Sequence, residues 1–177
     1  LTDQGNRLLD ECRTLFSQGD YGAAGTVLAE WEALKRSTGV VRSEEIDYMR
    51  TVISAENDLA GSLDMILGFM EKYPQSIYYN HMEALLGSSY FACREYRKAL
   101  ECFDETDPLL LEDRDSRRLV RHNAVSMIRC GQTDEGYVQL SILERLVSNP
   151  ETDEDIVFYK AYVDYARGNM NKAKTGF

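Results

Sequence analysis

Residues 86–108 read LGSSYFACREYRKALECFDETDP, and this stretch indicates the fold of the chain more clearly than any other. Tyr96 is followed three positions later by the small residue Ala99 and seven positions later by the aromatic residue Phe103. At this spacing the small and the aromatic side chain lie on one face of a helix. Pro108 follows, and proline cannot continue a helix. The stretch therefore predicts a helix that begins near Tyr96, packs closely on the helix before it and stops before Pro108.

The same spacing recurs about every 37 residues along the chain. The positions equivalent to Tyr96 are Tyr21, Leu59, Thr133 and Met170. The positions three residues later are all small: Ala24, Ser62, Ala99, Gly136 and Ala173. The positions seven residues later are all apolar: Leu28, Ile66, Phe103, Leu140 and Phe177. Two residues before each anchor lie Gly19, Asn57, Arg94, Gly131 and Gly168, four of which suit a left-handed turn between two helices.

This repeat predicts an all-α chain of about ten helices in five hairpins and no sheet. The prolines agree, because Pro74, Pro108 and Pro150 each lie where a second helix should stop. Thr152 and Asp155 have the spacing of a capping box at the start of the fifth hairpin. We expect one domain, residues 1–177, with hairpins at about 5–40, 43–75, 77–112 and 115–150 and an incomplete one at 153–177.

The pattern resembles the tetratricopeptide repeat (TPR), in which L-G-x2-Y is followed by A-x3-F and then by proline. The third hairpin is the best match, with Leu86-Gly87-x-x-Tyr90, then Ala99-x3-Phe103 and Pro108. The resemblance covers nearly the whole chain. It implies a right-handed α-α superhelix whose first helices line a concave groove that binds other proteins.

A narrower resemblance lies near the C-terminus, in the run from Phe158 to Asn169 and in the ending Lys174-Thr175-Gly176-Phe177. These residues resemble the N-terminal part of long repeat proteins of Bacteroidetes-type bacteria, which are exported to the cell envelope. The resemblance implies that the chain is a fragment of such a protein, located in the periplasm or cell envelope after removal of a signal. A cytoplasmic location is the alternative.

The composition limits the partners that the chain can bind. Thirty acidic and 20 basic residues give a formal net charge of −10, and phosphate binding needs clustered Lys and Arg. No stretch approaches 18 consecutive apolar residues, so no transmembrane helix is expected. We therefore expect a protein or peptide as the partner, and neither nucleic acid nor direct insertion into a membrane.

Catalytic and cofactor-binding motifs are missing from the sequence. The two histidines, His81 and His122, lie on different predicted helices and do not form H-E-x-x-H. There is no glycine-rich nucleotide motif, and the acidic run 151–155 lacks the alternation and glycine of a calcium loop. The four cysteines, Cys12, Cys93, Cys102 and Cys130, contain no C-x-x-C pair and are expected to be free. The chain is thus predicted to be no enzyme and to bind neither cofactor nor metal.

The candidate binding residues are those that the repeat places on the groove side of the first helices. Arg114, Arg118, Arg121 and Arg129 would share one face of the fourth hairpin's first helix. Steps of 37 residues then give the full set: Ala84, Ser88, Phe91, Arg114, Arg118, Arg121, Val125, Ile128, Arg129, Phe158, Tyr162 and Tyr165. Arginine and tyrosine are enriched at binding hot spots, and the arginines favour an acidic partner.

Two alternatives stay open for these residues. The arginines could form a solvated face paired with neighbouring acids, and the aromatic residues could pack against a following repeat. The leading hypothesis for function is a non-catalytic scaffold for protein–protein interaction. The second is the input module of a longer sensory or regulatory protein.

Overall fold

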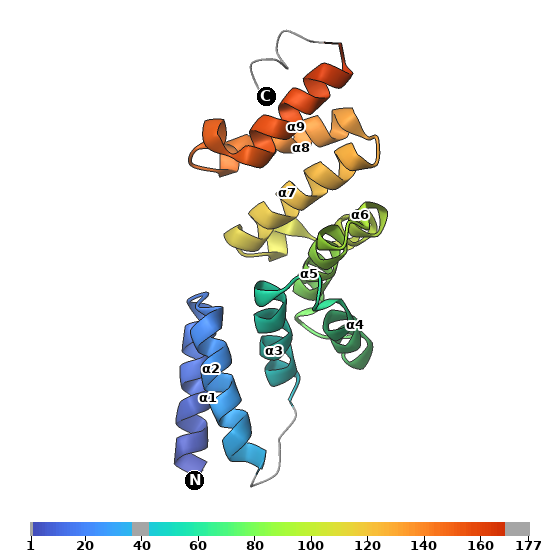
Figure 1. The fold of residues 1–177 in the computed structure, drawn as a ribbon. Coiled ribbons are helices and arrows are strands. Elements are labelled where there is room, and N and C mark those ends of the chain that lie inside the picture. The colour runs from blue at the N-terminus through green and yellow to red at the C-terminus, as the bar shows by residue number, and fades with distance from the viewer. Residues whose placement is uncertain (1, 37–42, 169–177) are drawn as a thin grey trace. The chain divides into compact units, whose positions relative to one another are not determined.

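The computed structural model describes residues 2–36 and 43–168, and these residues form helices without a β-strand (Figure 1). The α-helices are α1 (Thr2–Ser17), α2 (Tyr21–Arg36), α3 (Glu44–Asn57), α4 (Leu63–Lys72), α5 (Tyr79–Ala92), α6 (Tyr96–Glu105), α7 (Asp113–Arg129), α8 (Thr133–Leu146) and α9 (Glu154–Ala166). Two short 3-10 helices are η1 (Pro108–Leu110) and η2 (Pro150–Thr152). The predicted all-α class is confirmed. The tenth helix, expected at 170–177, lies outside the described residues.

The chain divides into two compact units, Leu1–Tyr79 and Asn80–Phe177. In the first unit α1 and α2 form a hairpin, and α3 and α4 follow (Figure 1). Its core joins one face of each of α1, α2 and α3, with the buried residues Cys12, Ala24, Leu28, Trp31, Ile46, Met49 and Ile53. The ring of Tyr48 stacks on that of Tyr78 at a centroid distance of 3.8 Å, so the segment after α4 packs back on α3.

In the second unit the hairpins α5/α6 and α7/α8 are followed by α9. Ala84, Ala99 and Phe103 form one buried cluster with Leu119, which lies on α7. A second buried cluster joins α7 and α8 to α9, with Ala124, Ile128, Leu140 and Val163. The hydrophobic contacts of this unit therefore run both within a hairpin and from one first helix to the next.

The described small residues of the repeat are buried. Ala24 and Ala99 are fully buried, Ser62 is 1% exposed, and Gly136 is buried as well. A Cβ atom on Gly136 would lie 2.5 Å from Ile128 Cγ1 and 2.9 Å from the backbone oxygen of Ala124. The close contact between α7 and α8 thus leaves no room for a side chain, as the small position predicts.

The turns at Gly19, Arg94 and Gly131 share one hydrogen-bond pattern, with a residue of positive φ after the first helix of the hairpin. Gly19, Gly131 and Gly168 have φ of 75°, 85° and 79°. Arg94 takes the same conformation, with φ of 61°, although L-residues with a side chain rarely do. Its N–H bonds the oxygen of Phe91, and the next N–H bonds that of Tyr90, which is the Schellman pattern. Asn57 instead belongs to α3, so the expectation of a left-handed turn there is wrong.

Two helices begin later than the sequence predicts. In the second hairpin α4 starts at Leu63 rather than near Leu59, because the Asp58 carboxylate accepts the N–H of Gly61 and holds a turn. In the fifth, the cap of α9 is Asp153 rather than Thr152, since Asp153 accepts the N–H of Ile156.

The prolines lie at the ends of second helices, as expected. Pro108 and Pro150 open η1 and η2, and Pro74 follows the end of α4. All four cysteines are free, as predicted. None of the described helices combines the length and the apolar composition that a membrane crossing requires.

Candidate functional site

The predicted groove residues do not form one open surface. Ala84, Ser88, Val125 and Ile128 are at most 5% exposed, so their side chains contact other helices rather than solvent. The interpretation of these four residues as groove residues is corrected: they are packing residues. These four residues are buried because each first helix packs against the first helix of the next hairpin.

Helix α7 covers the face of α5 that carries Ala84, Ser88 and Phe91. Ser88 Oγ lies 3.0 Å from His122 Nδ1, and the ring of Phe91 stacks on the imidazole of His122 at 4.1 Å between centroids. Ala84 packs in one buried cluster with Leu119 of α7. This face is therefore the contact between two successive first helices.

Helix α9 covers the equivalent face of α7. The guanidinium of Arg121 donates to both carboxylate oxygens of Asp153, at 2.7 and 2.6 Å, and to Asp155 at 2.9 Å. Ile128 packs with Val163 of α9. The hydrogen bond to Asp153 raises the pKa of Arg121, and the same bond lowers the pKa of Asp153. Because Asp153 caps α9, its hydrogen bonds with Arg121 hold the start of α9 against α7.

The other arginines of the predicted row have separate environments. Arg118 donates to Asp115, three residues before it, at 2.5 Å, and both side chains are largely buried. Arg118 thus pairs with an acid of its own helix, as the alternative expected, whereas the acids that pair with Arg121 lie 32 and 34 residues away at the start of α9. Arg114 is exposed at the start of α7. Arg129, at the end of α7, lies over the ring of Tyr96, 5.4 Å from its centroid.

The histidines serve packing and hydrogen bonding. His81 Nε2 lies 3.3 Å from Asp115 Oδ2. Burial raises the pKa of Asp115, but the hydrogen bond with His81 and the nearby charges of His81 and Arg118 outweigh burial and lower it to about 2. Burial, together with Arg118 and Arg121, lowers the pKa of His122 to about 3, so His122 is neutral at pH 7. In the part of the chain that the structure describes, no three acidic, histidine or cysteine side chains are grouped as metal ligands.

Three predicted residues form an exposed aromatic face on α9. Phe158, Tyr162 and Tyr165 are 48%, 44% and 55% exposed, and their spacing of four and three residues aligns them along the helix. Ile156 and Val163, on the other side of α9, are buried against the preceding hairpin. The three aromatic residues lie 37 residues after the positions of α7 that α9 itself covers.

A pocket of about 450 Å³ lies where the α5–α6 turn meets the end of α7. Its lining is mostly basic: Arg94, Glu95, Tyr96, Arg97, Lys98, Arg129 and Cys130. Of these residues the predicted set contains only Arg129. The basic run REYRK at 94–98 could have indicated part of this pocket from the sequence, but its proximity to Arg129 depends on how α6 and α7 pack.

The positive charges of this arginine pocket are incompletely neutralised. Glu95 forms an ion pair with Lys98. Within residues 2–36 and 43–168, no carboxylate lies within ion-pair distance of Arg94, Arg97 or Arg129. Three guanidinium groups without carboxylate partners therefore gather at one pocket of a chain whose net charge is −10.

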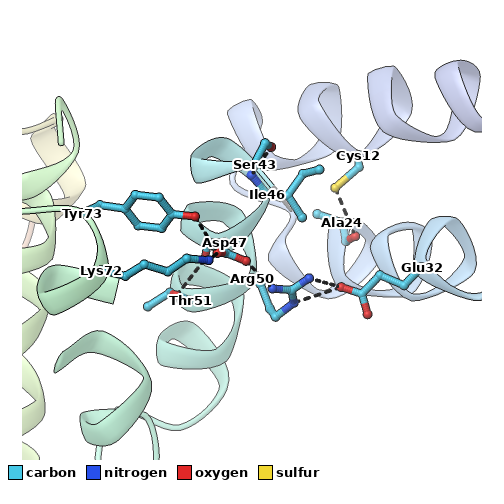
Figure 2. Close-up of polar contacts among 10 residues, drawn as sticks. All are labelled: Cys12, Ala24, Glu32, Ser43, Ile46, Asp47, Arg50, Thr51, Lys72 and Tyr73. Atoms are coloured by element: carbon cyan, nitrogen blue, oxygen red, sulfur yellow. Dashed lines mark hydrogen bonds and ion pairs between the residues drawn. The ribbon is translucent and has the colours of Figure 1, made fainter. Parts of the chain in front are cut away.

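The first unit holds a second charged cluster, which is fully paired. Asp47 accepts from Arg50 at 2.7 Å, from Lys72 at 2.6 Å and from Tyr73 at 2.8 Å, and Arg50 also donates to Glu32 at 2.6 Å (Figure 2). Burial raises the pKa of Asp47, but these hydrogen bonds outweigh it and the pKa falls below its usual value. A hollow of about 240 Å³ adjoins the cluster. Because the cluster links α2, α3 and α4, its role is structural.

Neither a protein-family model nor a curated protein matches the chain. Three similar solved structures are all of MamA, a TPR-like helical protein. A mutant of MamA superposes with a TM-score of 0.66 at 14% identity, over 99% of this chain and 95% of that chain. MamA of MSR-1 gives 0.63 at 15% identity, covering 98% and 92%, and MamA of AMB-1 gives 0.64 at 13%, covering 98% and 95%. The chain therefore has a TPR-type fold.

Proposed function

We propose that the chain is a non-catalytic scaffold that binds another protein through the exposed aromatic face of α9. On α5 and on α7, the next first helix packs on the face that is equivalent by repeat spacing to the face of α9 bearing Phe158, Tyr162 and Tyr165. On α9 this face remains substantially exposed.

The surrounding packing favours an amphipathic helix as the partner element. In the preceding contact α9 presents Ile156 and Val163, seven residues apart, to the hairpin before it. A helix with apolar residues at the same spacing would bury the three aromatic rings of α9. Tyrosine suits such a contact, because it buries a large ring and keeps its hydroxyl at the solvated rim. We therefore expect a partner helix with apolar residues at i, i+3 or i+4, and i+7.

The proposed location of the scaffold in the cell is supported only by the resemblance of the C-terminal residues. That resemblance supports a site in the cell envelope, within a longer bacterial repeat protein. Detection of the native protein in envelope fractions would test this location, and detection in the cytosol alone would contradict it.

Photo-crosslinking tests the binding face directly. Tyr162 is replaced by p-benzoylphenylalanine in the native host, and the protein is irradiated and recovered. The matched control carries the same group at Val138, which is 58% exposed on α8. We expect a covalent adduct to a distinct protein at position 162 and none at 138. Peptide sequencing of the adduct should show an amphipathic helix.

Three results would contradict the proposal. An adduct to a second copy of the chain would mean self-association. An adduct within the same polypeptide would mean that a following repeat covers the face. Equal adducts at positions 162 and 138 would mean non-specific contact.

A further inference from the structure

The conformation of Arg94 is the first indication of a second binding site. The equivalent positions of three other hairpins hold Gly19, Gly131 and Gly168, all with positive φ. A glycine would form the same turn with less strain, so the fold does not require arginine at position 94. Strained residues of this kind gather at functional sites. Arg94 is one of the residues that line the arginine pocket.

The contrast with other arginines of the chain is the second indication. Arg13 donates to Glu45 at 2.6 and 2.7 Å, Arg50 to Glu32 at 2.6 Å and Arg121 to Asp153 at 2.6 Å. These guanidinium groups are occupied by carboxylates of the chain itself. In the arginine pocket the one acidic residue, Glu95, pairs with Lys98 instead.

Aromatic contact orients one of the three unpaired arginines. The guanidinium of Arg129 lies over the ring of Tyr96, 5.4 Å from its centroid, and an aromatic ring forms a cation–π contact without using up the N–H donors of the guanidinium. A guanidinium edge binds a carboxylate through two parallel hydrogen bonds. At about 450 Å³ the pocket is in the size range of small-ligand sites, large enough for one or two acidic side chains.

We propose that the pocket formed by Arg94, Tyr96, Arg97 and Arg129 binds carboxylates of an acidic protein segment. The proposal rests on the function proposed above, since it assigns a second contact to the same scaffold. A nucleic acid is the less favourable occupant, because a long polyanion would be repelled by the rest of a chain with a net charge of −10. A short acidic segment needs to reach only the positive pocket.

Calorimetric titration with N-acetylated hexaglutamate, and with hexaglutamine as the uncharged probe, tests the proposal. We expect saturable binding of hexaglutamate, weakened by added salt, and no binding of hexaglutamine. Arg97→Gln with Arg129→Gln should weaken binding by at least about tenfold, because two charge-assisted contacts are lost. Arg117→Gln with Arg145→Gln is the matched control: both residues are exposed, outside the pocket, and the net charge changes equally.

Cys130 provides a local readout of occupancy because it lines the pocket. Bound hexaglutamate should slow the alkylation of Cys130, measured by mass spectrometry, more than that of Cys93, which does not line it. Arg94→Gly should lower the affinity while raising the midpoint of thermal unfolding, since it removes both the guanidinium and the strain. A loss of affinity through misfolding would lower both quantities.

Several outcomes would overturn the pocket assignment. One is equal weakening by the two double variants, which would indicate only overall charge. Another is displacement of hexaglutamate by inorganic phosphate at equal ionic strength, which would indicate a general anion site. If hexaglutamate does not bind while the adduct at position 162 persists, the pocket assignment fails and the scaffold proposal stands. If that adduct is missing while hexaglutamate binds, the reverse holds.

Discussion

The Asp47 cluster of the first unit and the arginine pocket of the second are built from the same kinds of residue but differ in charge balance. The Asp47 carboxylate accepts hydrogen bonds from Arg50, Lys72 and Tyr73, and Glu32 forms an ion pair with Arg50. In the arginine pocket Glu95 balances Lys98, and three guanidinium groups have no carboxylate partner among the described residues.

The charges of the Asp47 cluster hold helices together, whereas the arginines of the pocket remain available to bind a partner. The Arg50–Glu32 pair joins α3 to α2, and the bonds of Asp47 to Lys72 and Tyr73 join α3 to the end of α4, so these bonds restrain the position of one helix against another. Removal of one member leaves partly buried charges unpaired, which is costly. The arginines of the pocket can be removed without stranding an opposite charge. Stability measurements on matched variants can therefore test whether the two groups of charges differ in this way.

The largest effect is expected for Asp47→Ala, which removes three hydrogen bonds from a carboxylate that is only 16% exposed. We expect a loss of about 2 kcal/mol in the free energy of unfolding, because hydrogen bonds to charged groups are at stake. Urea unfolding followed by the fluorescence of Trp31, the single tryptophan and a core residue of the same unit, measures it. Glu71→Ala, an exposed acid on α4, is the control. Equal effects of the two changes would remove the structural role of Asp47.

The stabilisation by the Asp47 carboxylate should disappear at acidic pH. The pKa of Asp47 is lowered in the folded protein, so its contribution is present above the unfolded pKa and is lost as the pH falls through the folded pKa. Wild type and Asp47→Asn should therefore differ fully at pH 7 and converge as the pH falls below about 4. Urea midpoints between pH 7 and pH 2 provide the test. A gap of constant size over this range would contradict the assigned pKa shift.

A smaller loss is expected for Arg121→Ala. This arginine is paired like those of the Asp47 cluster but lies in the second unit, where it bonds the cap of α9. Its side chain is 27% exposed, so we expect a cost of about 1–2 kcal/mol, measured by circular dichroism during urea unfolding. Arg117→Ala, an exposed arginine of the same helix, should stay within about 0.5 kcal/mol. The reverse ranking would show that pairing with α9 adds nothing to stability.

The opposite sign is expected for Arg94→Gly. The change relieves the left-handed conformation of Arg94, which costs about 1–2 kcal/mol in an L-residue, while the added freedom of glycine in the unfolded chain offsets up to about 1 kcal/mol. A net gain of about 0.5 kcal/mol should raise the thermal midpoint slightly. Glu101→Gly, at an exposed position in the interior of α6, should instead lower the thermal midpoint, because glycine is less favourable than other residues in a helix interior. If both variants lost stability, Arg94 would have a structural role.

The smallest effect is expected for Arg97→Gln with Arg129→Gln. No carboxylate partner is lost and both side chains are exposed, so the free energy of unfolding should change by no more than about 0.5 kcal/mol. Chemical denaturation of this double variant measures the change. A loss as large as that of Asp47→Ala would mean that the arginine pocket is structural too, and the comparison would fail.

The helical hairpins and the buried small residues between their helices could be predicted from the sequence. Ala24, Ala99 and Gly136 are buried at the predicted spacing, and Gly19 and Gly131 form the predicted turns. These features follow from local rules, since helical periodicity, steric size and glycine's access to positive φ act within one turn or one hairpin. The departures are also local. Arg94 takes a turn position that its type disfavours, and Asp58 delays α4 through a turn that the repeat spacing does not encode.

Which faces of the first helices are exposed depends on the packing of neighbouring helices and could not be predicted from the sequence. Val125 and Ile128 lie on a face that equal repeat spacing placed in a groove, yet α9 covers it. The partner of Arg121 is Asp153, 32 residues away, and the pocket beside Arg97 is completed by Arg129. Such pairings depend on how neighbouring helices rotate and cross, which side-chain packing between hairpins sets. The periodicity of a single helix places residues on a common face, but the helix that packs beside it decides whether that face is core, ion pair or open surface.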